Sequence, residues 1–167
     1  MKKFLCVLCL MLVFLSATLL SCSAQPPVAC TEVLDAMRLS ANSPDGRVYF
    51  IGSDTADKVL TSQLMSSLLG ESALGYFYLD AEGKSAVDDC AVFLSPTGTC
   101  ELFVFRCADS RDCPSLARLC LSRLSLLSGR DGFVEGGGRV SVIDNYVILA
   151  VCESPDAALD TAKRVIK

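Results

Sequence analysis

Residues 90–105 read CAVFLSPTGTCELFVF, and the rest of the architecture can be worked out from this stretch. Two runs rich in β-branched and aromatic residues, 90–94 and 101–105, flank the sequence SPTGT, whose Ser, Pro and Gly favour a turn. The pattern predicts a β-hairpin. If the strands pair about that turn, the numbers of facing residues sum to about 195, so Cys90 faces Phe105.

A helix is expected after this hairpin. Ser110 is a candidate N-cap, and Gly129 a candidate stop. Between them an apolar stripe recurs at helical spacing, made by Leu116, Cys120, Leu124 and Leu127.

The same order of elements recurs near the end of the chain. Residues 140–143 and 146–151 read as strands around Asp144-Asn145, a dipeptide suited to a tight hairpin, and Ser154-Pro155 begins a last helix. We therefore expect an α+β fold with an antiparallel sheet in a ββα-ββα arrangement and helices on one face. One side of the second hairpin, expected beneath those helices, carries Val140, Val142, Val147, Leu149 and Val151.

The segment before the first hairpin predicts one or two further helices. Residues 28–39 have helical apolar spacing, and residues 47–51 form a candidate strand. A second helix is expected from Ser53 or Asp54 to Gly70, and residues 76–78 read as a brief aromatic strand. The glycines at 136–138 lack the Lys-Ser/Thr of a phosphate-binding loop, so we interpret them as a connector.

The first residues have the pattern of an export signal. Lys2 and Lys3 precede an apolar stretch, 4–20, which as a helix would reach about 26 Å, slightly less than a bilayer core. The sequence LLSC at 19–22 resembles the lipobox of bacterial lipoproteins, which implies a diacylglycerol on the Cys22 thiol and cleavage before it.

We therefore expect a lipoprotein-type signal peptide over 1–21, a tether over 22–29 and a single small α+β domain over 30–167. Two alternatives stay open: cleavage after Ala24 by an ordinary signal peptidase, which would give a secreted product, and an uncleaved signal anchor. All three place the domain outside the cytoplasm.

Composition excludes several function classes. Residues 1–21 hold two of the 15 Lys and Arg and none of the 19 acidic residues, so the remainder has a net charge of −6. An acidic chain without a basic run argues against nucleic acid as a partner. The absence of His removes Ser-His-Asp and Cys-His catalysis and every His-ligated zinc or haem site, and no metal or other cofactor is expected.

The layout resembles a known family. The lipobox leader, AVFLSP at 91–96, ELFVF at 101–105, Ala108-Asp109 before a helix, and DNYVIL at 144–149 before SPDAA carry the likeness. It is a resemblance to the small lipoproteins of Gram-positive anaerobes grouped as the domain of unknown function numbered 4358, and it covers most of residues 50–167. The resemblance implies a compact α+β surface domain with no established activity. The cysteine content is higher than the resemblance implies.

With Cys22 acylated, an odd number of cysteines remains: 30, 90, 100, 107, 113, 120 and 152. The favoured interpretation is that they are small buried hydrophobic residues. A Cys90–Cys107 disulfide is the alternative, because Cys107 lies diagonally from Cys90 on the same side of the hairpin. Their spacing lacks the close pairs of a zinc site.

Two polar groups have a functional and a simpler interpretation. The carboxylates of Asp80, Glu82, Asp88 and Asp89 could bind a cation, but a solvated acidic loop is the favoured interpretation, since defined ligand spacing is missing. Tyr76 and Tyr78 could stack on a ligand, but packing is favoured.

No catalytic residue can be assigned, and the chain is expected not to be an enzyme. The first functional hypothesis is a non-catalytic module that is held on the membrane by its lipid and binds an unidentified envelope protein or small ligand. The alternative is an extracytoplasmic enzyme using carboxylate or thiol chemistry, which a pocket lined by two carboxylates or an exposed low-pKa thiol would favour. A component of envelope assembly is a third hypothesis, which an apolar surface patch would support.

Overall fold

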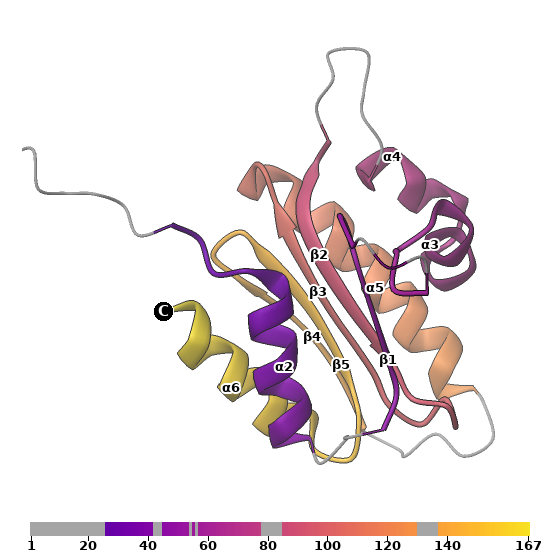
Figure 1. Cartoon of the computed structure of the whole chain (residues 1–167), viewed down its shortest axis with the longest axis vertical. Helices are drawn as coiled ribbons and strands as arrows, with labels where there is room; N and C mark the ends of the chain where they lie inside the picture. The colour runs from indigo at the N-terminus through magenta and orange to yellow at the C-terminus, as the bar shows by residue number, and fades with distance from the viewer. Residues whose placement is uncertain (1–25, 42–44, 54, 56, 78–84, 130–136) are drawn as a thin grey trace, which may run out of the picture.

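The computed structural model describes residues 26–41, 45–53, 55, 57–77, 85–129 and 137–167. At its centre is a five-stranded sheet of order β1-β2-β3-β5-β4 in which every neighbouring pair is antiparallel (Figure 1). The strands are β1 (Arg47–Phe50), β2 (Val87–Leu94), β3 (Glu101–Cys107), β4 (Gly138–Ile143) and β5 (Tyr146–Val151). The α+β class and the antiparallel sheet are confirmed.

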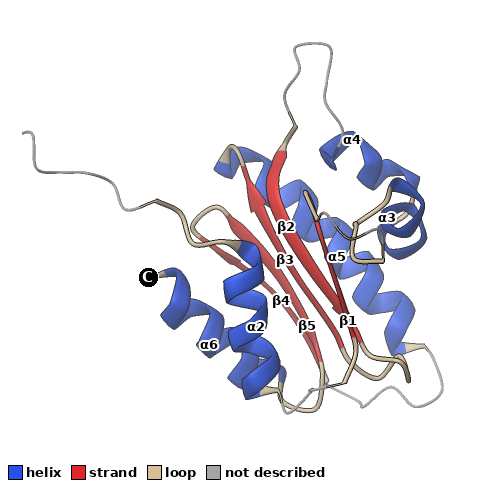
Figure 2. Ribbon diagram, viewed as in Figure 1, coloured by secondary structure: helices blue, strands red, loops and turns tan. Residues whose placement is uncertain are grey.

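Helices cover both faces of this sheet (Figure 2). On one face lie α2 (Cys30–Ser40) and α6 (Pro155–Ile166); on the other lie α3 (Ser62–Leu69), the short α4 (Leu74–Phe77) and α5 (Cys113–Ser128). The sheet therefore separates two apolar clusters, one beneath α2 and α6 and one beneath α3 and α5. The expectation that all helices share one face was wrong.

The physical reason lies in the central strands. Leu102 and Val104 of β3 point into the cluster with α2 and α6, while Phe103 and Phe105 point into the cluster with α5. All four side chains are fully buried. A continuous apolar run is typical of a strand buried on both sides, and it needs a helix layer on each.

The two hairpins have the predicted registers. Cys90 faces Phe105 in the first. In the second, Val140 faces Leu149 and the turn residue Asp144 adopts a positive φ of 53°. The predicted common side of this hairpin faces α5, although Val142 stays about half exposed. Gly138 is not part of a connector, because it starts β4 directly beneath α5, where a Cβ atom would collide with Leu124.

The segment between β1 and β2 differs from expectation. The helix α3 begins at Ser62, not at 53 or 54, and the Thr61 side chain caps it by accepting a hydrogen bond from the Leu64 amide at 3.2 Å. Among the preceding residues, Val59 forms an isolated parallel bridge with Phe50. The expected strand at 76–78 was also wrong: Tyr76 and Phe77 lie in α4, and residue 78 lies outside the described residues.

Candidate functional site

A row of polar side chains crosses the sheet at the end where α2 begins. The register sets Asp89 of β2 opposite Arg106 of β3, and Arg106 opposite Tyr146 of β5. These three residues lie on strands whose other positions on this face are apolar and buried. We call Asp89, Arg106 and Tyr146 the polar row.

The polar row holds the segment that leads into α2. The Tyr146 hydroxyl donates a hydrogen bond to the Val28 carbonyl at 2.6 Å, and Arg106 Nη1 donates to the same oxygen at 3.4 Å. Burial raises the pKa of Tyr146, so the hydroxyl keeps its proton and remains a donor at neutral pH. The chain is thus fixed to β3 and β5 two residues before the helix starts.

Asp89 caps α2 from a different element. The residue before the helix, Ala29, has no side chain that can cap it, and the Cys30 amide instead donates to Asp89 Oδ2 at 2.8 Å. A carboxylate at a helix N-terminus also interacts favourably with the helix dipole. Arg106 Nη1 lies 3.7 Å from the same carboxylate, and Arg106 Nε donates to Asp88 Oδ1 at 2.8 Å, so its positive charge partly offsets the two negative charges.

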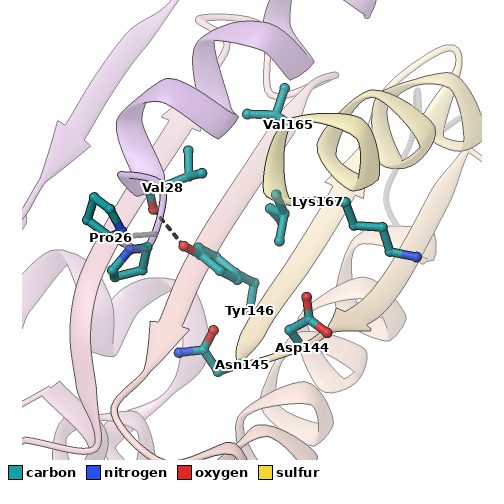
Figure 3. Close-up of a pocket in the computed structure, with 9 residues that line it drawn as sticks. Pro26, Val28, Asp144, Asn145, Tyr146, Val165 and Lys167 are labelled. Carbon is teal, nitrogen blue, oxygen red and sulfur yellow. Dashed lines mark hydrogen bonds between the residues drawn. The ribbon is translucent and has the colours of Figure 1, made fainter. Parts of the chain in front are cut away.

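A shallow cavity of about 530 Å³ lies beside this row. It is lined by Pro26 to Val28, by the β4–β5 turn at 144–146 and by the end of α6 at 165–167. Figure 3 shows the Tyr146 side chain between the proline segment and the turn. Asp144 and Lys167 supply one charge of each sign, and Asn145 is held in place because its amide donates to the Cys107 carbonyl at 2.9 Å.

A second, smaller cavity of about 230 Å³ lies between the end of β1 and helices α3 and α4. Its lining is apolar: Ile51, Gly52, Val59, Leu60, Met65 and Phe77. Phe77 also packs edge-on against Phe105 of the sheet, with ring centroids 5.3 Å apart. Such a lining favours apolar contact and supplies no side-chain acid, base or nucleophile.

The residues expected to form functional groups are dispersed. Asp88 and Asp89 are engaged by Arg106, while Asp80 and Glu82 lie outside the described residues, as do Tyr78 and Cys22. Tyr76 is half-buried against the cluster beneath α5. Within the described part of the chain, no three His, Cys, Asp or Glu residues come together as a metal site.

The described cysteines are all buried and carry thiols. Burial raises the pKa of Cys30, Cys90, Cys107 and Cys120, the last to about 12. A hydrogen bond between the Cys152 and Cys100 thiols, together with burial, raises the pKa of Cys152. Raised pKa values lower the fraction of thiolate, the reactive species.

Cys90 and Cys107 belong to the same apolar cluster, as expected. An irregularity between Val87 and Asp89 sets Cys107 opposite Val87, and its hydrogen-bonded thiol neighbour is Cys113. The Cys90–Cys107 disulfide stays a prediction.

The sequence signals for the polar row were present but weak. Arg106 is a charged residue at the end of an otherwise apolar strand, which indicates a partner on the same face. Tyr146 directly follows a tight turn, where a hydroxyl can reach a neighbouring segment. Neither residue could be linked to Val28 without knowing the strand order β3-β5.

Comparison with protein-family models, with curated proteins and with solved structures finds no significant match for this chain. Among the residues that the structure describes, no helix is long and apolar enough to cross a bilayer.

Proposed function

We propose that this chain is an exported domain, anchored to the extracytoplasmic face of a membrane by a lipid on Cys22, and that it acts as a non-catalytic binding module. The sequence support is the charged and apolar leader followed by LLSC at 19–22. The four Cα-to-Cα steps from Cys22 to Pro26 span at most about 14 Å, so the domain would sit close to the lipid surface.

The observation that carries the binding role is the cavity next to the polar row. Its wall includes Pro26 and Pro27, which belong to the expected tether, and the row fixes the tether at Val28. A ligand there would meet an aromatic ring, two prolines and one charge of each sign, which suits a small amphipathic molecule or a peptide segment of an envelope protein.

The enzymatic alternative has less support. The described lining of the larger cavity contains one carboxylate, Asp144, and no thiol. The described cysteines are buried, and the pKa shifts found among them are upward. A thiol nucleophile requires the opposite, an accessible group with a lowered pKa.

The anchor can be tested by expressing the full chain with its own leader in a bacterial host fed an alkyne fatty acid. Wild-type protein should carry the label and sediment with membranes, and Cys22→Ser should lose the label. Cys9→Ser, which alters a leader cysteine outside the lipobox, is the matched control and should label normally. Label that persists in Cys22→Ser would contradict the proposal.

The binding role can be tested in the same cells with a photo-crosslinking amino acid placed at Asp144, in the cavity wall. The matched control places it at Arg118, an exposed position on α5, across the sheet from α2 and α6. We expect a defined cross-linked product from position 144 alone. Identical products, or none, at the two positions would argue against the cavity as the binding surface.

A further inference from the structure

Two pairs of thiols meet at the two ends of β3. At its start, Glu101 faces Val151 across the β3–β5 pair, so one step further Cys100 faces Cys152. Both residues are buried, with 6% and 2% of their surface exposed. The backbone hydrogen bonds on either side of the two residues define how closely they lie.

The backbone groups of Cys100 point toward β2 and away from Cys152. Its amide donates to Ser95 Oγ and its carbonyl accepts from the Ser95 amide, each at 2.9 Å. The Cys152 amide donates to the Gly137 carbonyl, also at 2.9 Å, on the β4 side. Cys100 and Cys152 therefore form a non-hydrogen-bonded pair, in which Cα atoms lie about 4.5 Å apart. That separation is within the range of about 4.4–6.8 Å that a disulfide spans.

The second pair is at the opposite end of the strand. Cys107 is the last residue of β3 and Cys113 is the first residue of α5, with only five residues between them. Both side chains are buried in the cluster beneath α5, and their thiols are hydrogen-bonded to each other. The turn that starts α5 thus returns the chain to the strand it has just left.

We infer that Cys100–Cys152 and Cys107–Cys113 are two disulfide sites, closed as the domain folds outside the cytoplasm. The inference rests on the export proposed above for its oxidising surroundings. The oxidant is a protein or small-molecule disulfide. One protein thiolate attacks it, forming a mixed disulfide and releasing one thiol; the partner cysteine then displaces the second thiol. The protein loses two hydrogens per bond, and the oxidant's disulfide is reduced to two thiols.

Burial determines when these bonds can form. In the folded protein Cys107 and Cys152 are shielded and hold their protons tightly, so attack on an oxidant is slow. Closure therefore belongs to folding, before α5 packs over Cys107 and Cys113 and before α2 and α6 pack over the cluster that holds Cys100 and Cys152. The finished bonds are then shielded from reductants. Cys30 and Cys90 lie in different clusters on opposite faces of the sheet, and with Cys120 they stay as packing residues.

Peptide mapping tests the pairing directly. The full-length chain in detergent is unfolded with guanidinium chloride and dithiothreitol, refolded in a glutathione redox buffer, alkylated and digested with trypsin. We expect peptide 107–111 linked to 112–118, and peptide 85–106 linked to 140–163, each lighter by two hydrogens than its separate parts. Trypsin cleaves between Cys107 and Cys113 at Arg111, so the first link is unambiguous.

Variants resolve the second link, because Cys90 and Cys100 share one peptide. Cys100→Ser should abolish it and Cys90→Ser should keep it. Cys120→Ser, the matched buried control, should keep both links. Alkylation of both pairs after refolding, or a link that survives in Cys100→Ser, would overturn the inference.

Protein isolated from the envelope separates this inference from the proposed anchor. If that protein carries acylated Cys22 and both links, the inference is supported in the cell. If it carries acylated Cys22 but alkylatable thiols at these four positions, the inference is overturned while the lipid anchor stands.

Discussion

Arg123 and Glu101 form a bidentate ion pair between α5 and β3, at 2.6 and 2.9 Å. Both side chains are buried within the layer that the sequence pattern treats as apolar. Leaving one charge of such a pair without its partner is costly, whereas replacing both with apolar residues of similar size is often neutral.

We therefore predict that Arg123→Met lowers the free energy of unfolding by about 3–5 kcal/mol. Adding Glu101→Leu in the same chain should recover most of that loss. Urea unfolding of the two variants and the wild type measures both effects. The matched control is Arg118→Met, an exposed change on the same helix that should cost little. A double variant less stable than Arg123→Met would contradict this account of the pair.

At the scale of elements, α2 depends on a cap that comes from β2. We predict that Asp89→Ala destabilises the protein by about 1 kcal/mol, because the Cys30 amide loses its acceptor at the helix N-terminus. Hydrogen exchange should become faster at the first amides of α2. Asp88→Ala is the adjacent control; it removes an exposed carboxylate that binds Arg106 but does not cap the helix. Equal exchange in the two variants would contradict the cap.

Local patterns predicted the elements better than their arrangement. Turn residues and apolar runs gave both hairpins with their registers, and helical spacing gave α2, α5 and α6. The division of the helices between the two faces of the sheet was missed. The apolar run of β3 indicates a helix layer on each face, but it does not indicate which helix covers which face.

The polar row and the thiol pairs were missed for a related reason. The polar row and the Cys100–Cys152 pair depend on β3 pairing with β5, a contact between strands about 40 residues apart that no local periodicity of the sequence predicts. The Cys107–Cys113 pair depends on the turn that leads from β3 into α5. The Cys90–Cys107 hypothesis used only the first hairpin. Once β5 lies beside β3, Cys152 becomes the neighbour of Cys100, and the turn into α5 brings Cys113 to Cys107.

At the scale of the whole molecule, buried thiols couple stability to alkaline pH. Five described thiols have a pKa above their ordinary 9.0 in the folded state. The folded protein thus binds these thiol protons more tightly than the unfolded chain does. The contribution of the thiols to the free energy of unfolding is therefore fully present below pH 9 and is lost as the pH rises above it. Each thiol can contribute a slope of up to about 1.4 kcal/mol per pH unit.

We predict that the reduced protein loses stability steeply between pH 9 and 11, measured as the free energy of unfolding in urea. Closing the two disulfides should flatten this slope, since Cys107 and Cys152 no longer titrate, and the Cys100–Cys152 link across about 50 residues should add about 4 kcal/mol at neutral pH. In the protein without disulfides, Cys120→Ala should make the free energy of unfolding fall less steeply with pH, by the contribution of one thiol. A pH-independent stability in the reduced protein would contradict the buried, protonated thiols.

The proposed placement of this domain outside the cell, on a lipid, can be tested at the N-terminus of the protein isolated from cells. Mass spectrometry of the tryptic N-terminal peptide distinguishes the possibilities, because no Lys or Arg lies between positions 4 and 37. We predict a peptide 22–38 that starts at Cys22 and carries a diacylglycerol on its sulfur. An unmodified peptide starting at Gln25, or an uncleaved peptide starting at Phe4, would contradict it.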